Sequence, residues 1–159
     1  MDIVLSDLIL QFLADCYSST GLGALMKIAH KYFGNACVLM DSSYKTLFHI
    51  GGTNLNDQTW REISQDGYFS KETLSTFMSE GLIANDFRML YPCYSPTIYD
   101  EGHAENVRRM SIAIPSRRNI PSGWFTVFEE TRPITEVDKT LLSWFAKVLA
   151  PQMESFVTN

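Results

Sequence analysis

The side chains best suited to carry out chemistry in this chain are its three cysteines and three histidines. Cys16, Cys37 and Cys93 are an odd number of thiols and include no C-x-x-C pair. This pattern favours free thiols in a reducing compartment over a disulfide framework. A thiol becomes a nucleophile only where its surroundings favour the thiolate. Cys93, in the loop sequence PCYSP, has no second cysteine near it, so the simplest interpretation is an ordinary loop thiol without a catalytic role.

Histidine and carboxylate spacing gives no indication of a metal site. His49 lies in a predicted strand, and His103 and Glu105 lie in a predicted loop. A metal or haem site needs several ligands that converge on one point, and the spacing of these residues predicts no such cluster. The sequence also lacks G-x-S-x-G, H-E-x-x-H, a P-loop and a glycine-rich dinucleotide turn. We therefore expect no metal, no cofactor and no enzymatic activity.

Aromatic residues and methionines gather in the middle of the chain, where they could line a cavity for a small metabolite. Such sites are mostly apolar, with a few polar groups that orient the ligand. The candidate lining residues are Phe48, Trp60, Tyr68, Phe69, Phe77, Met89, Tyr91 and Tyr94, with Met110 and Ile112 as the floor. Arg88, Arg108 and Arg109 could anchor an anionic ligand. An ordinary aromatic core with solvent-exposed arginines fits the same residues equally well.

The elements that would position this cavity begin with two predicted helices. Apolar residues recur every three or four positions over residues 3–17 and again over residues 21–33. The first helix is apolar around most of its circumference, so it must be buried on more than one side. We expect a second copy of the chain to cover it, through Leu5, Ile9, Leu10 and Phe12.

Strands and shorter helices follow. Apolar residues predict strands at residues 36–41, 45–50, 95–99, 109–115 and 123–129. Two short helices are predicted between residues 54 and 88, the second beginning at Ser70. A last helix begins at a capping box formed by Thr135 and Asp138, and Pro151 inside it predicts a kink. This order predicts an α+β fold, an antiparallel sheet with helices on both faces.

Charge and hydropathy exclude other classes of protein. The formal net charge of −5 argues against direct contact with nucleic acid, which requires a basic face. No run approaches the roughly 20 apolar residues that span a bilayer. The N-terminal segment lacks the basic start of a signal peptide. We expect a cytoplasmic location without membrane contact.

Three stretches that together span most of the chain carry a resemblance to a known family. They are LADCYSSTGLGALMKIAHKYFG, NACVLMDSSYKTLFHIGG and RRMSIAIPSRRNIPSGWFTVFEETRPITEVDKTLLSWFAKVLAPQM. In pattern and order they resemble the GAF/PAS-like sensory domains that precede the DNA-binding part of bacterial transcription regulators, notably PucR-like ones. The resemblance implies a five- to six-stranded antiparallel sheet. Its terminal helices would pack on one face and form a dimer, while the middle helices would roof a pocket on the other.

On this resemblance we expect residues 1–159 to form a single GAF-like sensory domain, the N-terminal fragment of a longer regulator. It would be non-enzymatic, form a homodimer through its terminal helices and bind an unknown small metabolite. One alternative is a dimerisation module without a ligand. Another is a redox enzyme that uses Cys93, because some GAF domains are cysteine-dependent methionine sulfoxide reductases. The sequence signatures of cyclic-nucleotide-binding and bilin-binding relatives are not found.

Overall fold

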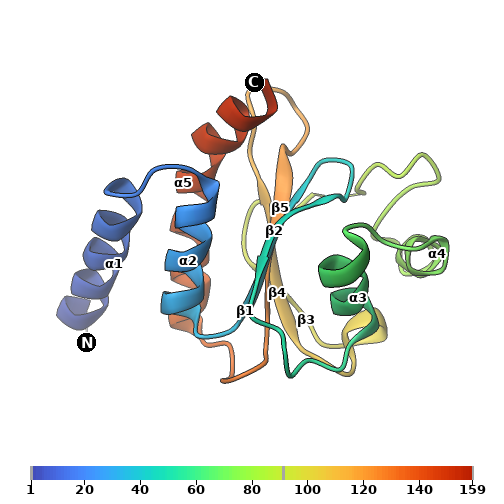
Figure 1. Cartoon of the computed structure of the whole chain (residues 1–159), viewed down its shortest axis with the longest axis horizontal. Helices are drawn as coiled ribbons and strands as arrows, with labels where there is room; N and C mark the ends of the chain where they lie inside the picture. The colour runs from blue at the N-terminus through green and yellow to red at the C-terminus, as the bar shows by residue number, and fades with distance from the viewer. Residues whose placement is uncertain (1, 91, 159) are drawn as a thin grey trace.

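The computed structural model describes residues 2–90 and 92–158, which are built in layers around one antiparallel sheet (Figure 1). The strands are β1 (Ala36–Asp41), β2 (Thr46–Ile50), β3 (Thr97–Tyr99), β4 (Arg109–Ile114) and β5 (Gly123–Phe128). Their order in the sheet is β2-β1-β5-β4-β3, and every neighbouring pair is antiparallel. The five strands confirm the predicted sheet, and each predicted strand is found within two residues of its expected bounds.

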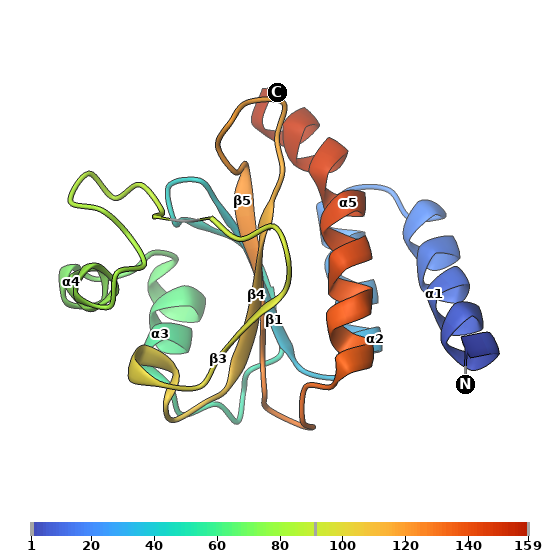
Figure 2. The ribbon, with the colours of Figure 1, turned by 180° about the vertical axis from the view of Figure 1, so that it is seen from behind.

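Helices cover both faces of this sheet, as predicted. The helices are α1 (Asp2–Tyr17), α2 (Leu22–Phe33), α3 (Gln58–Arg61), α4 (Lys71–Ser79) and α5 (Glu136–Thr158). A π-helical turn, Glu62–Asp66, extends α3, and a 3-10 turn, Gly102–Ala104, precedes β4. Helices α2 and α5 lie on one face, with α1 outside them, while α3 and α4 lie on the other face (Figures 1 and 2). The fold class is α+β.

Local sequence explains where several helices begin and end. Gly34 adopts the left-handed conformation after α2, with φ of 62°, and its N–H bonds to the carbonyl of His30. The Ser70 hydroxyl accepts from the Thr73 N–H at the start of α4. At the start of α5, the Thr135 N–H donates to Asp138 Oδ2 at 2.8 Å. The Asp138 N–H bonds in return to Thr135 Oγ1. The caps predicted at Ser70 and Thr135 therefore form.

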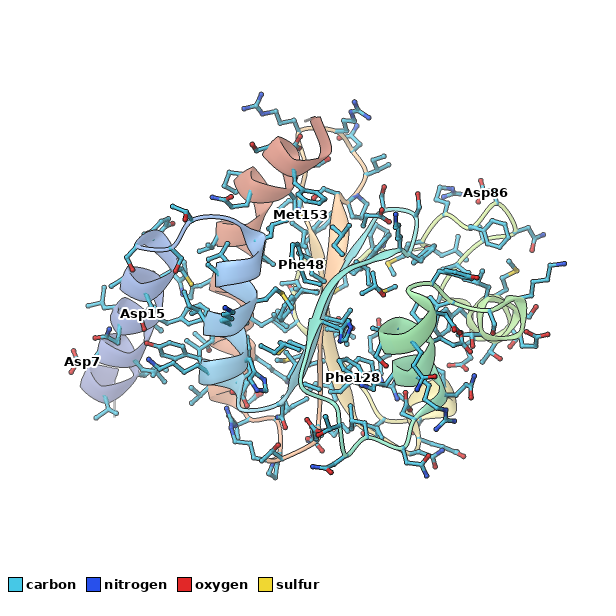
Figure 3. The ribbon with its side chains drawn as sticks, in the orientation of Figure 1. Asp7, Asp15, Phe48, Asp86, Phe128 and Met153 are labelled. Carbon is cyan, nitrogen blue, oxygen red and sulfur yellow. The ribbon has the colours of Figure 1, made fainter. Side chains whose placement is uncertain are left out.

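The alternation of side chains along the strands divides the core in two. Phe125, Val127 and the apolar face of β4 pack with α1, α2 and α5. Trp124, Phe128 and the opposite face of β1 pack with α3 and α4. Figure 3 shows the division, with Phe48 on the α2 side of the sheet and Phe128 on the α3 side.

This division corrects one of the two residues predicted for the floor of the cavity. The side chain of Met110 is fully buried beneath α2 and α5 and does not line the cavity, whereas Ile112 packs in the same cluster and still borders the cavity. Phe48 also packs on that side, at 6.4 Å from the ring of Phe156. The larger apolar face of β4 meets the larger helical layer because that layer can bury it completely. The other face, which carries Arg109, Ser111 and Ala113, is turned to α3 and α4.

The packing of the terminal helices corrects one residue of the predicted dimer contact, Phe12. The side chain of Phe12 has no exposed surface, and its ring packs on Tyr32 at 5.0 Å and on Phe145 at 5.7 Å. It is therefore a core residue of the monomer and cannot reach a partner. Leu10, by contrast, is 65% exposed. Pro151 lies inside α5, whose last turns change direction toward the β4–β5 loop (Figure 2).

Candidate functional site

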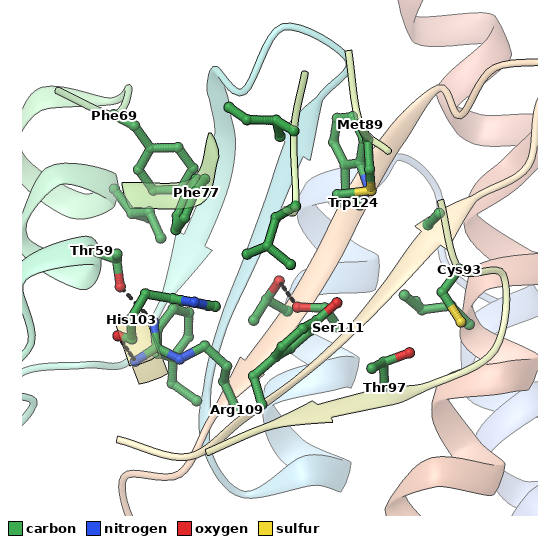
Figure 4. A pocket seen from close by; sticks show the side chains of 18 residues that line it. Thr59, Phe69, Phe77, Met89, Cys93, Thr97, His103, Arg109, Ser111 and Trp124 are labelled. Atoms are coloured by element: carbon green, nitrogen blue, oxygen red, sulfur yellow. Dashed lines mark hydrogen bonds between the residues drawn. The ribbon is translucent and has the colours of Figure 1, made fainter. Parts of the chain in front are cut away.

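A cavity of about 110 Å³ lies between the sheet and the layer that contains α3 and α4 (Figure 4). Its floor is the face of β4 and β5 that carries Ser111, Ala113 and Thr126. Phe69, Phe77 and the loop around Met89 close it from the other side. A bridge between Ile83 and Met89 holds this loop in place. The walls are thus mostly apolar, with polar groups at a few points.

Two hydroxyl groups on the floor form the first polar feature. Ser111 and Thr126 lie opposite each other on β4 and β5, and their hydroxyl oxygens are 2.7 Å apart. One hydroxyl donates to the other, so the proton of the accepting hydroxyl is left for a further partner. The floor can therefore both donate to a bound molecule and accept from it.

His103, from the turn before β4, forms the second polar feature. Its side chain is only 10% exposed and its Nδ1 lies 2.8 Å from a carboxylate oxygen of Glu80. The backbone N–H of His103 donates to the same carboxylate at 3.0 Å. The ring packs against Phe77 at 5.1 Å and Tyr99 at 5.5 Å, and it projects into the cavity (Figure 4). Glu80 therefore holds the imidazole in one orientation.

Arg109 enters the cavity wall from β4 but forms a buried ion pair. Its Nη2 donates to Asp57 Oδ1 at 2.8 Å, and both side chains are 4% exposed. Its Nη1 donates to the Thr59 hydroxyl at 2.6 Å, and its Nε donates to the Val107 carbonyl at 3.1 Å. The guanidinium carbon lies 4.5 Å from the ring of Phe128.

The Asp57 carboxylate also caps α3 through the Trp60 N–H. Burial by itself would raise the pKa of the Asp57 carboxyl group. The hydrogen bond from Thr59 and the positive charge of Arg109 outweigh burial, so the pKa of Asp57 lies below its ordinary value.

A wide groove of about 770 Å³ adjoins the cavity. Phe69, Met89 and Trp124 line both spaces and so separate them. The indole N–H of Trp124 points to the sulfur of Met89 at 3.0 Å, which holds these two side chains together. A small movement of Met89 would therefore connect the cavity with the groove.

The structure brings together only some of the residues predicted to line a pocket. Phe69, Phe77, Met89 and Ile112 line the cavity. Trp60, a residue of α3, is buried against Phe128 but does not line the cavity. Tyr68 is 63% exposed and lies in the groove, and Tyr94 is exposed. Phe48 and Met110 lie on the opposite face of the sheet. Tyr91 is outside the described residues.

The three arginines predicted to anchor an anion all have acidic partners within the chain. Arg88 pairs with Asp86 at 3.6 Å on the surface, beside the groove. Arg108 pairs with Glu129 at 3.1 Å, away from the cavity. Arg109 lines the cavity, but its anion is Asp57, as described above. The predicted anchoring role is thus replaced at Arg109 by a structural one.

Cys93 lies at the edge of the cavity, where its carbonyl accepts from the Ala113 N–H at 2.9 Å. Its thiol is exposed and donates to the Ser95 carbonyl at 3.1 Å. Cys16 and Cys37 are both buried in the cluster on the other side of the sheet. A resolving thiol for Cys93 is thus not at hand in the described part of the chain. Residues 2–90 and 92–158 contain no group of three or more His, Cys, Asp or Glu side chains that could hold a metal ion.

Sequence reasoning named Arg109 but missed the other polar groups described here, in and beside the cavity. His103 was considered only as a metal ligand, and Ser111, Thr126 and Glu80 were not considered. A signal for the floor was present in β4, where Arg109, Ser111 and Ala113 alternate with larger apolar residues. Glu80 and His103 are 23 positions apart, so nothing local in the sequence indicates their contact.

Within residues 2–90 and 92–158, no helix combines the length and apolar character needed to cross a bilayer.

Comparison with known proteins connects this geometry to one fold. No family model matches the sequence, and a search of curated proteins finds no match. Among solved structures, the chain is similar to the GAF domain of a protein described as a sensor histidine kinase from Pseudomonas syringae pv. tomato. The TM-score is 0.57 at 12% identity, over 99% of this chain and 90% of that one.

A second similar structure is the GAF domain of a phosphoenolpyruvate-protein phosphotransferase from Acinetobacter. Its TM-score is 0.49 at 11% identity, over 99% of this chain and 97% of that one. The likeness to the first structure, together with the order of helices and strands, shows that this chain has the fold of a GAF domain.

Proposed function

We propose that this chain is a non-enzymatic sensory domain that binds a small molecule in the cavity between its sheet and α3 and α4. The observation that carries the proposal is the oriented His103 imidazole, held by Glu80 and facing the Ser111–Thr126 hydroxyl pair in a mostly apolar cavity (Figure 4). An apolar enclosure with a few convergent polar groups is the usual form of a small-molecule site. A filled structural core would have no need of such groups, since buried polar groups are costly.

The fold offers a route from this cavity to the terminal helices. Strands β4 and β5 form the floor with one face, while the opposite face packs on α5. A ligand that favours one packing of the roof would therefore bias the position of α5 through the sheet. We place the chain in the cytoplasm as part of a bacterial transcription regulator, in which such a bias would reach the DNA-binding part. This context rests on the sequence resemblance.

Dimer formation through the terminal helices is the second part of the proposal. Leu10 is 65% exposed, and Val4 and Tyr17 are also exposed on α1. On α5, Trp144 and Phe156 are exposed as well. Large apolar side chains on two neighbouring helices favour a protein contact, and a second copy of the same chain is the partner that is always present.

The alternative of a dimerisation module without a ligand is favoured by the size of the cavity. Its volume of about 110 Å³ is below the roughly 300–1,000 Å³ of typical ligand sites. A ligand larger than a small ring would have to displace Met89 and use the adjoining groove. The two proposals therefore differ in whether any molecule binds beneath α3 and α4.

Native mass spectrometry of the purified chain, followed by a thermal-shift screen of metabolites, tests the proposal. The variant Ala113→Leu places a larger side chain on the cavity floor and should abolish any binding found. Ser75→Leu, at an exposed position of α4, adds the same side chain outside the cavity as a control. If Ala113→Leu unfolds, the near-isosteric Thr126→Val removes one floor hydroxyl instead. Undiminished binding by the folded floor variants would place the ligand elsewhere, and no binding at all would favour the scaffold.

A further inference from the structure

The charges around the cavity decide what kind of ligand it accepts. All three guanidinium nitrogens of Arg109 already donate hydrogen bonds within the chain, and the Asp57 carboxylate compensates the positive charge. Arg109 therefore offers no free positive charge to a ligand. Glu80, which contacts His103 beside the cavity, carries a negative charge. An anionic ligand would thus lose its hydration without gaining a free cation, which is costly.

The hydrogen-bonding direction at His103 follows from its contact with Glu80. The carboxylate can only accept, so Nδ1 carries the hydrogen of the neutral imidazole. In the neutral imidazole Nε2 is then an acceptor, on the edge of the ring away from the backbone, and the His103 side chain lines the cavity (Figure 4). A ligand that reaches this nitrogen must donate a hydrogen bond to it.

Size and wall chemistry restrict the ligand further. The cavity of about 110 Å³ is smaller than an apolar cavity of about 150 Å³ that accepts benzene. Several aromatic rings line it, together with the flexible thioether of Met89. Aromatic walls favour a flat ring, which they contact face-on or edge-on. A five-membered ring fits this space, and a six-membered ring would require Met89 to move.

We infer that the cavity selects small, uncharged, flat ring compounds that donate a hydrogen bond to His103 Nε2, such as N–H heteroaromatics. This inference rests on the proposed function and adds the ligand class to it. It replaces the expectation of an anionic ligand, because the arginines on which that expectation depended are paired within the chain.

Pyrrole, furan and propionate separate the possibilities because they are similar in size. Pyrrole has an N–H donor, furan is its near-isostere without the donor, and propionate is an anion. Binding to the whole chain is followed by NMR of methyl groups that line the cavity, in Ile63, Ile83 and Met89. The methyls of Leu142, on the other side of the sheet, serve as the internal control. Xenon, which enters apolar cavities, reports whether the space exists in solution.

We expect pyrrole to bind about three to ten times more tightly than furan, the usual effect of one hydrogen bond. Propionate should not shift the cavity methyls. In His103→Asn, the side-chain amide can keep the contact with Glu80 but lacks the Nε2 position, so the preference for pyrrole should disappear. His103→Gln places an amide oxygen near that position and should retain part of it.

Each result decides the matter. Equal binding of pyrrole and furan, a preference that persists in His103→Asn, or tighter binding of propionate would overturn the inference and leave the proposed sensor intact. Xenon binding without binding of any of the three probes would do the same. If xenon itself fails to shift the cavity methyls, the cavity is not open to ligands and the proposed function falls with the inference.

Discussion

Replacing Arg109 with methionine should lower the free energy of unfolding by about 3 to 5 kcal/mol, the usual cost of leaving one member of a buried ion pair without its partner. Methionine can fill part of the space of the arginine side chain, whose guanidinium carbon lies 4.5 Å from the centre of the Phe128 ring. It leaves the Asp57 carboxylate, which is 4% exposed, without a counter-charge. For a domain of this size the loss corresponds to a fall in Tm of about 6 to 20 °C.

A double-mutant cycle isolates the charge interaction. Asp57→Asn removes the negative charge but retains an N-cap for α3, because asparagine caps helices as well as aspartate does. Each single variant should be destabilised. The double variant should recover stability, with a coupling energy of about 2 to 3 kcal/mol. Urea unfolding followed by tryptophan fluorescence measures all four proteins.

Additive effects of the two substitutions would refute the reasoning, because they would mean that Arg109 and Asp57 do not depend on each other. The same result is informative about function. If Arg109 were an anchor for an anionic ligand, Arg109→Met would change anion binding and leave stability nearly unchanged. A large loss of stability with strong coupling would instead confirm that the positive charge belongs to the fold.

Three further predictions concern pH, thiol reactivity and assembly. Because the pKa of Asp57 is lowered in the folded state, its contribution to stability is present above about pH 4 and is lost as the pH falls through the folded pKa. The difference between the free energies of unfolding at pH 7 and at pH 3 should therefore be smaller in Asp57→Asn than in the original protein. An equal difference in the two proteins would contradict this prediction. Cys93 is exposed and should react with a thiol reagent in the native protein. Cys16 and Cys37 are buried and should react only on unfolding; burial raises the pKa of Cys16 to about 11. Mass spectrometry counts the modified thiols, and native labelling of all three would show that the core opens. Leu10→Glu should dissociate the proposed dimer in sedimentation experiments, with a change in monomer stability within about 0.5 kcal/mol; a dimer that persists would place the contact elsewhere.

The sequence by itself determined the elements and their class. Helical and strand periodicities predicted the order of helices and strands, and the caps at Ser70 and Thr135 formed as expected. These signals are local, since they depend on residues within one or two turns of each other. An antiparallel sheet with helices on both faces then follows, because each element must bury its apolar side.

The tertiary structure decided which face of the sheet belongs to the cavity and what the polar residues do there. Alternation in β4 separates Met110 from Ser111, but it does not say which face meets the larger helical layer. Likewise, Arg109 reaches across 52 positions to Asp57. Contacts of this kind depend on packing between distant segments, and no local pattern in the sequence encodes them.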